Sequence, residues 1–234
     1  MLYIYSFLSF SINLFISNFS FYIDKNINCL YKLNISIILA AGLSKRFNDI
    51  TPKQLYPING KPLVQYSIDA IEPIVDDIII VTNSKVQINT NHTVLTNDID
   101  DRLQSIKTAI DFIGNKHYQK VIIHDAARPF ITSDYIRTLV NSNYSHSQYY
   151  MKLVNGLAKK NEFGWEIPNR EDFIELCSPQ CTEYDLFKFI FKKYIETGIQ
   201  CEVLPCLSYL ELEPNLIEGY YKYLRKITTT DDIY

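Results

Sequence analysis

Short apolar runs alternate with segments of helical periodicity along most of this 234-residue chain, and no other feature constrains its fold as strongly. Apolar runs bounded by polar residues are typical of strands buried in a sheet. They occur at 35–41, 77–83, 92–97 and 120–125. Apolar residues at helical spacing occur between them, at 63–74, 100–114 and 132–142. This alternation predicts an α/β fold with a mostly parallel sheet and flanking helices.

The last third of the chain departs from that alternation. Residues 149–173 have the pattern of two extended segments around a polar turn, which predicts a β-arm. The arm is either a plain surface hairpin or an element that packs on a second subunit. After it we expect a helix over 182–198 and strands over 215–219 and 225–229.

The first 34 residues form a hydrophobic leader. No charged residue occurs from Leu2 to Ile23, which is about the ~20 residues that a membrane-spanning helix needs. The segment lacks the basic start and the small-residue cleavage site of a secretory signal. Three alternatives stay open: a membrane anchor, a disordered leader, or translated sequence before the true start. We therefore divide the chain into the leader, 1–34, and one domain, 35–234, with membrane contact only if the leader is an anchor.

Charge and cysteine usage exclude two classes of protein. A net charge of −3 and a pI near 5.8 argue against a nucleic-acid partner bound on a broad basic surface. The cysteines are odd in number and contain no CxxC pair, which favours reduced thiols over a zinc site or a disulfide framework. They are Cys29, Cys177, Cys181, Cys201 and Cys206. Reduced thiols predict a cytoplasmic protein.

A basic loop follows the first predicted strand. Its small residues Ala40, Ala41 and Gly42 allow backbone N–H groups to approach an anion closely. Arg46 and Lys53 follow in the same loop and can reach that anion. The spacing matches neither a Walker A loop nor GxGxxG. The residue types favour phosphate binding modestly over an ordinary polar loop.

His124 and Asp125 end another predicted strand. In open parallel sheets, ligands bind beyond the carboxyl ends of the strands, so Asp125 is expected to face the same crevice as the basic loop. A carboxylate opposite Arg46 and Lys53 can hold Mg²⁺ between phosphate oxygens. The alternatives for Asp125 are a helix cap or a partner for Arg128. We interpret His124 as a structural histidine and Arg128 as a brace for its loop.

Five stretches occur in one order along the chain: ILAAGLSKRF…TPKQLYPINGKPL, DDRLQSI, VIIHDAARPF, LCSPQ and RKITTTDD. As a set they closely resemble the 2-C-methyl-D-erythritol 4-phosphate cytidylyltransferases and the related D-ribitol-5-phosphate cytidylyltransferases, over roughly 35–234. The resemblance implies a Rossmann-like nucleotidyltransferase domain with a projecting β-arm that crosses to a partner in a homodimer. It implies a reaction of CTP with a polyol phosphate, assisted by Mg²⁺, that gives a CDP-polyol and pyrophosphate. The methylerythritol acceptor is preferred, ribitol 5-phosphate is the alternative, and a nucleotide-binding homologue without catalysis is a further one.

The resemblance also implies roles for individual residues. Contacts with CTP are implied for Ala40, Ala41, Gly42, Asp100, Ser105 and Ala126. Catalysis by neutralising phosphate charge is implied for Arg46, Lys53 and Lys226, and metal binding for Asp125. Binding of the acceptor phosphate is implied for Lys159, Arg170 and Ser178. The alternatives are solvated lysines, an arm surface pair of Arg170 with Glu171 or Asp172, and a plain turn at Ser178.

Two departures from the family pattern bear on this site. Ser44 stands where a second glycine is usual, which is tolerable unless its φ is positive. Leu204, Pro205 and Cys206 stand where the family has an acidic pair, one of which helps to hold the metal. Mg²⁺ is therefore expected to depend on Asp125, phosphate oxygens and water.

Overall fold

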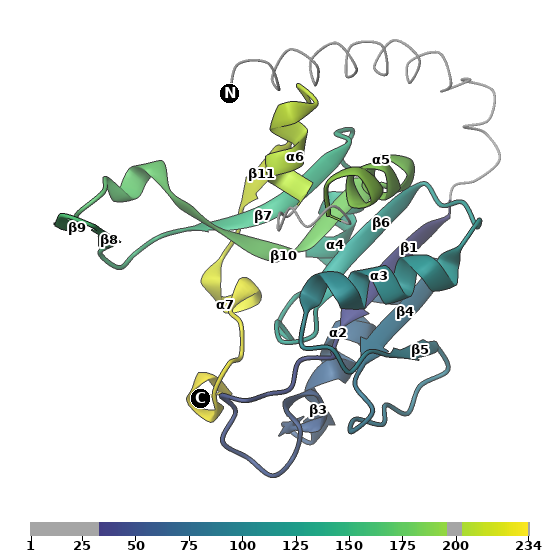
Figure 1. Cartoon of the computed structure of the whole chain (residues 1–234). Coiled ribbons are helices and arrows are strands. Elements are labelled where there is room, and N and C mark those ends of the chain that lie inside the picture. Colours follow the sequence, from purple (N-terminus) through teal and green to yellow (C-terminus); the bar gives the residue numbers. More distant parts are fainter. Residues whose placement is uncertain (1–32, 196–202, 234) are drawn as a thin grey trace.

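The computed structural model describes residues 33–195 and 203–233 (Figure 1). Apart from its last two residues, the predicted leader lies outside the described residues, as do Cys29 and Cys201. Among the residues described, no helix combines the length and the apolar character that crossing a membrane requires. The described cysteines, Cys177, Cys181 and Cys206, are buried free thiols.

A seven-stranded sheet forms the centre of the fold, in the order β11-β7-β10-β6-β1-β4-β5. Its strands are β1 Asn34–Leu39, β4 Asp77–Thr82, β5 Thr93–Thr96, β6 Lys120–Asp125, β7 His146–Lys152, β10 Ile174–Glu183 and β11 Asn215–Glu218. β1 pairs in parallel with β4 and β6, β5 with β4, and β11 with β7. β10 runs antiparallel to both β6 and β7. The predicted mostly parallel sheet is confirmed.

Helices cover both faces of this sheet, which is why successive residues of its central strands are buried and most of them are apolar. β1 contributes Ile35 and Ile37 to one core and Ile38 to the other. The first core contains side chains of α3 Arg102–Ile113, α5 Tyr184–Ile190 and α6 Val203–Tyr209. The second contains side chains of α2 Leu63–Ile71 and α4 Ser133–Val140. The two cores fix β1 and β6 side by side, so that their carboxyl ends lie at the same edge.

Local signals set the ends of the helices. The Asp101 carboxylate caps α3 by accepting the N–H groups of Leu103 and Gln104, and Gly114 ends that helix with φ +58°. Thr132 occupies the N-cap position of α4, but its side chain makes no capping hydrogen bond.

The outer ends of β7 and β10 leave the sheet as a projecting arm (Figure 1). β8 Lys159–Asn161 and β9 Gly164–Glu166 form a two-stranded hairpin at its tip, and the short helix η3 Arg170–Asp172 follows. The β-arm predicted at about 149–173 is confirmed. The base of the arm is held in the main sheet, where the first residues of β7, His146 to Tyr149, are buried.

Two predicted elements need correction. The strand expected at 225–229 is wrong: the chain forms the short helix α7 Tyr221–Leu224, continues without strand pairing, and ends in the 3₁₀ helix η5 Thr230–Ile233. A single backbone bond, from the Ile227 N–H to the Ala127 carbonyl at 2.7 Å, holds this segment against the loop after β6. The helix expected from residue 182 begins at Tyr184, because Thr182 pairs within β10.

Besides α7 and the short 3₁₀ helices, two features are absent from the sequence-based prediction. One is α6, which has few residues to show a helical period. The other is the hairpin of β2 Pro57–Ile58 and β3 Lys61–Pro62, whose turn residues Asn59 and Gly60 have φ of +50° and +79°. An Asn-Gly pair is a strong hairpin signal, so this second element was readable from the sequence.

Candidate active site

The carboxyl ends of β1 and β6 border a cleft of about 320 Å³. Its lining comes from segments far apart in the sequence: the loop after β1, the start of α3, the loop after β6 and the chain beyond α7. Among the lining residues are Ala40, Ala41, Gly42, Arg46, Lys53, Asp100, Ser105, Asp125, Ala126 and Lys226. The structure thus brings together all the residues predicted for CTP, for catalysis and for the metal.

Arg46, Lys53 and Lys226 give the cleft its positive charge. Lys53 lies in the short helix η2 Lys53–Leu55, and its Nζ donates to the Ile227 carbonyl at 3.0 Å. That bond ties the first loop to the segment that carries Lys226. Burial lowers the pKa of Lys53, and the positive charges of Lys226 and Arg46 lower it further. A cation whose neighbours disfavour its charge is typical of a site that receives an anion.

Asp125 is the counter-ion of this group. Its Oδ2 lies 3.2 Å from Lys226 Nζ, and its Oδ1 lies 3.3 Å from Arg102 Nε. Burial acts to raise the pKa of Asp125, but the charges of Arg102 and Lys226 outweigh it and hold that pKa well below its usual range. The carboxylate is therefore ionised. Its partners are Arg102 and Lys226, and not Arg128 or a helix N-terminus, which were the alternatives from the sequence.

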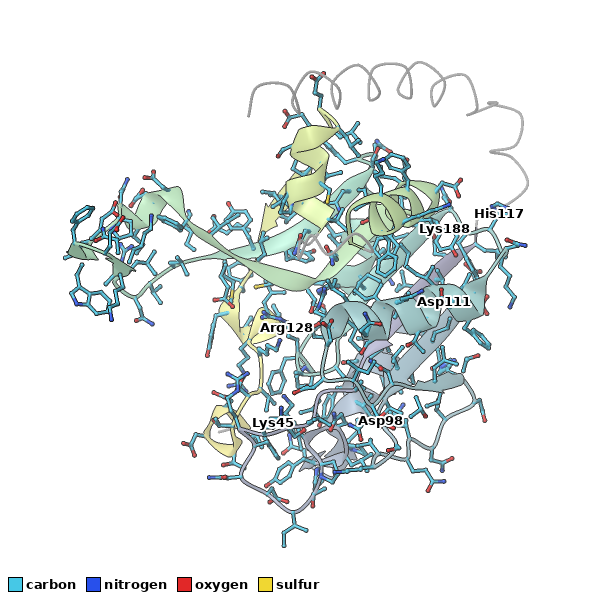
Figure 2. All side chains as sticks on the ribbon, viewed as in Figure 1. Lys45, Asp98, Asp111, His117, Arg128 and Lys188 are labelled. Carbon is cyan, nitrogen blue, oxygen red and sulfur yellow. The ribbon has the colours of Figure 1, made fainter. Side chains whose placement is uncertain are left out.

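Arg128 and His124 have structural roles, as interpreted from the sequence. Arg128 is buried; its Nη1 donates to the Leu224 carbonyl, and its Nη2 lies 3.6 Å from Glu175. Figure 2 shows Arg128 beside the root of the arm, where it braces the loop after β6 against α7. His124 is fully buried, with its Nε2 3.2 Å from Ser67 Oγ. Burial lowers the pKa of His124 to about 4, so the ring is neutral at pH 7.

The start of α3 forms the opposite rim of the cleft. Asp100 pairs with Lys45 of the loop after β1, with 2.8 Å between Lys45 Nζ and the carboxylate. The hydrogen bond from Lys45 lowers the pKa of Asp100. Ser105 donates to the Asp101 carbonyl at 3.2 Å and accepts from Asn97 Nδ2 at 2.9 Å. Figure 2 labels Lys45 and Asp98 near this end of the molecule.

The three residues predicted for the acceptor phosphate do not line the cleft of their own chain. Ser178 comes closest: it is buried, and its Oγ accepts the Asp125 N–H at 3.0 Å. Lys159 and Arg170 lie on the arm, which projects away from the sheet (Figure 1). The Arg170 side chain donates to the Val154 carbonyl at 2.9 Å, within the arm. Any contact of these arm residues with a cleft would be with that of a second chain.

The sequence analysis missed two amide side chains that hold the loop after β1. Gln54 is buried, and its Nε2 donates to the carbonyls of Ala40 at 2.6 Å and Gly42 at 2.7 Å. Asn83 is also buried and donates from Nδ2 to the Ala41 carbonyl at 3.0 Å. Gln54 stands inside the quoted stretch TPKQL, which was the available signal. Asn83 directly follows β4 at the ligand-binding edge of the sheet, where topology could have indicated it.

Arg102 was missed as well, although it lies in the quoted stretch DDRLQSI. As the first residue of α3 it lines the cleft and pairs with Asp125. Ser44 meets the condition set for strain, because its φ is +55°. A left-handed conformation costs a non-glycine residue about 1–2 kcal/mol. The Ser44 hydroxyl donates to Gln54 Oε1 at 3.3 Å, which offsets part of that cost.

The donor set of the cleft suits a magnesium ion that arrives with phosphate ligands. In the described part of the chain, no group of three or more His, Cys, Asp or Glu side chains could hold a metal. Asp100 and Asp101 also line the cleft, but one is paired with Lys45 and the other caps α3. Asp125 therefore fits as a single carboxylate ligand, with phosphate oxygens and water completing the shell, as Mg²⁺ tolerates well.

The amino-acid sequence matches the family model for 2-C-methyl-D-erythritol 4-phosphate cytidylyltransferase over residues 34–234. A protein of that name from Clostridium botulinum is 29% identical over 224 residues, covering 86% of this chain and 94% of the relative. Another, from Thermotoga neapolitana, is 28% identical over 167 residues, covering 67% of this chain and 75% of the relative.

Solved structures support the same fold. The 4-diphosphocytidyl-2C-methyl-D-erythritol synthase of Anaerococcus prevotii superposes with a TM-score of 0.71 at 18% identity, covering 86% of this chain and 95% of that one. The 2-C-methyl-D-erythritol 4-phosphate cytidylyltransferase of Thermus thermophilus superposes with a TM-score of 0.69 at 17% identity, covering 85% and 94%. With the family model spanning the whole described domain, the chain belongs to the 2-C-methyl-D-erythritol 4-phosphate cytidylyltransferase family of nucleotidyltransferases.

Proposed function

We propose that this chain transfers CMP from CTP to 2-C-methyl-D-erythritol 4-phosphate and releases pyrophosphate. The observation that carries the proposal is the convergence of Arg46, Lys53 and Lys226 on one cleft beside Asp125. A triphosphate supplies the negative charge that this group of cations lacks. The name of the matched family and of its relatives supports CTP and 2-C-methyl-D-erythritol 4-phosphate as the two substrates.

The proposed reaction needs positioning and charge neutralisation rather than a protein nucleophile. A phosphate oxygen of the acceptor attacks the α-phosphorus of CTP and forms a new P–O bond. The bond from that phosphorus to the oxygen bridging the β-phosphate breaks, and pyrophosphate leaves with the electron pair. Arg46, Lys53 and Lys226 neutralise the charge on the phosphate oxygens. Because Lys53 is already held by Ile227, little reorganisation is needed.

Asp125 changes partners in this proposal. In the structure, its carboxylate neutralises Arg102 and Lys226. When the phosphates of CTP take over that role, an ionised carboxylate becomes available in the cleft. Asp125 would then hold Mg²⁺ together with phosphate oxygens and water, and the ion supplies further neutralisation of phosphate charge.

The arm supports a homodimer. Phe163 and Ile167 are 93% and 84% exposed, and Val154 and Trp165 are also largely exposed. Large apolar side chains gathered on a projecting element mark a protein interface. We propose that each arm packs on a second copy and brings Lys159 and Arg170 to the partner's cleft. Sedimentation equilibrium tests this: the double variant Phe163→Ser, Ile167→Ser should be a monomer where the unmodified chain is a dimer.

The free thiols of Cys177, Cys181 and Cys206 support the reducing conditions of the cytoplasm as the place of action. Fractionation of cells that express the full chain tests this together with the alternative of a membrane-anchored leader. Recovery in the membrane fraction, abolished by starting the chain at residue 34, would favour the anchor.

A pyrophosphate-release assay tests the function. The chain is incubated with CTP and Mg²⁺ and either methylerythritol phosphate, ribitol 5-phosphate or no acceptor. We expect release with methylerythritol phosphate, because the relatives are named as cytidylyltransferases of that acceptor. Release with ribitol 5-phosphate alone would transfer the proposal to that acceptor. CTP binding without release with either acceptor would favour the non-catalytic homologue.

A further inference from the structure

Three consecutive carbonyl groups of the loop after β1 are each bonded to a side-chain amide. Gln54 Nε2 donates to the carbonyls of Ala40 and Gly42 at 2.6 and 2.7 Å. Asn83 Nδ2 donates to the carbonyl between them, that of Ala41, at 3.0 Å. The two amides come from different elements, because Gln54 lies in η2 and Asn83 follows β4. Both side chains are about as buried as the apolar core, at 3% and 4% exposure.

This arrangement fixes which polar groups of the loop are available to the cleft. The three carbonyls are engaged by Gln54 and Asn83, and the Ala40 N–H donates to the Val81 carbonyl at 2.7 Å. In the described part of the chain, the N–H groups of Ala41 and Gly42 have no protein acceptor. Carbonyl oxygens repel phosphate, whereas unpaired N–H groups attract it. The amides therefore engage the carbonyls of Ala40, Ala41 and Gly42, while the N–H groups of Ala41 and Gly42 stay available as donors.

Ser44 contacts the oxygen end of one of these amides, and its hydroxyl also lies 3.5 Å from the Gly42 carbonyl. Its hydroxyl donates to Gln54 Oε1 at 3.3 Å, so the oxygen end of the amide faces Ser44 and the nitrogen end faces the carbonyls of Ala40 and Gly42. The reversed amide would place its oxygen against those two carbonyl oxygens. A glycine at position 44 would relax the backbone, whose φ is +55°, but would remove this hydroxyl.

We propose that Gln54 and Asn83 are positioning residues for the nucleotide. By donating hydrogen bonds to the loop carbonyls, they keep these carbonyls away from the phosphates, so that the N–H groups of Ala41 and Gly42 bind phosphate oxygens of CTP. Ser44 acts through Gln54 by fixing its amide. This inference rests on the proposed function and deepens it, because it names two buried side chains that keep the loop in position for the phosphate. The competing explanation is that the two amides only satisfy buried carbonyls and stabilise the fold.

Binding of CTP and of cytidine separates the two explanations. Gln54→Met and Asn83→Leu keep the size of the side chains and remove the donors. In each variant we expect CTP to bind about tenfold more weakly or worse, because a freed carbonyl competes with the phosphate, and cytidine to bind within twofold of the unmodified chain. Ser44→Ala should weaken CTP about threefold. Calorimetry for CTP and NMR titration for cytidine measure the affinities.

Gln65→Met is the matched control, because the Gln65 amide donates to Asp69 at 2.7 Å on α2, away from the cleft lining. It should bind CTP normally. Unchanged CTP affinity in Gln54→Met and Asn83→Leu, or equal losses for CTP and cytidine, would overturn the inference. If Gln54→Met does not fold, Asn83→Leu and Ser44→Ala decide. If the unmodified chain binds CTP but shows no turnover with either acceptor, only the proposed function is refuted. If the unmodified chain is active and the Gln54 and Asn83 variants bind CTP normally, only the present inference is refuted.

Discussion

Replacing Lys53 by methionine removes one positive charge from the cleft and keeps most of the side-chain stem. Two effects on stability then oppose each other. The hydrogen bond from Nζ to the Ile227 carbonyl is lost, which costs about 0.5–1.5 kcal/mol. The substitution also removes the cost of burying the charge and the repulsion from Lys226 and Arg46, which stabilises the fold. These are the factors that lower the pKa of Lys53. We therefore expect unfolding free energy to change by no more than about 1 kcal/mol.

Catalysis should respond far more strongly than stability. Loss of one preorganised group that stabilises transition-state charge typically lowers kcat by ~10²–10³. Lys53→Met should therefore lose turnover on that scale, while its Tm shifts by at most about 4 °C, as ~1 kcal/mol implies for a domain of this size. CTP affinity should fall less than kcat, because charge grows on the phosphate oxygens as the reaction proceeds. Lys53→Arg keeps the charge and should recover part of the rate.

Pyrophosphate release at saturating CTP and acceptor measures the rate, and calorimetric melting measures stability. Lys61→Met is the control: Lys61 lies outside the cleft lining and pairs with Asp69 at 2.5 Å. Its turnover should be unchanged. A normal rate in Lys53→Met, or a rate loss fully explained by unfolding at the assay temperature, would refute the role given to this lysine.

The pH dependence of stability supplies a second readout of the same group. The pKa of Lys53 is lowered in the folded protein from its ordinary 10.5, so the unfolded chain binds more protons between the two values. Stability should therefore rise with pH in that window as Lys53 loses its charge. Urea unfolding at stepped alkaline pH should show this rise in the unmodified chain and a smaller one in Lys53→Met; identical slopes would contradict the assignment.

Three further predictions concern other parts of the molecule. Ser44→Gly should be more stable in urea than Ser44→Ala by about 1 kcal/mol, because φ at 44 is +55° and alanine keeps the strain without the hydroxyl; equal stability would mean that the strain is negligible. Burial lowers the pKa of His146 to about 4, so stability should fall as the pH drops from 6.5 through 4, and His146→Gln should show a shallower fall in urea titrations; a parallel fall would assign the acid sensitivity elsewhere. Mixing inactive Lys53→Ala and Arg170→Ala chains should restore part of the pyrophosphate release, because one of the two clefts in the mixed dimer then receives both side chains; no recovery would argue against shared sites.

Among the elements that the sequence predicted correctly are the strands whose pattern is set by burial on both sides. β1, β4 and β6 each contain a run of apolar residues because helices cover both faces of the sheet. The segment at 225–229 has no such pattern: it is held by one backbone bond to Ala127 and by neighbours from elsewhere in the chain, so its sequence does not specify a strand. α6 was missed because a short helix repeats its period too few times to be recognised.

The site divides along the same line. That the loops of Gly42 and Asp125 meet followed from the sequence, because parallel strands place their carboxyl ends at one edge of the sheet. Which atoms pair did not follow. That Asp125 binds Arg102 and Lys226, that Gln54 and Asn83 hold the first loop, and that the arm directs Arg170 away from its own cleft depend on side chains from distant segments. Local sequence sets burial and backbone preference, whereas the partner of a polar group is set by whatever the folded chain places within hydrogen-bonding distance.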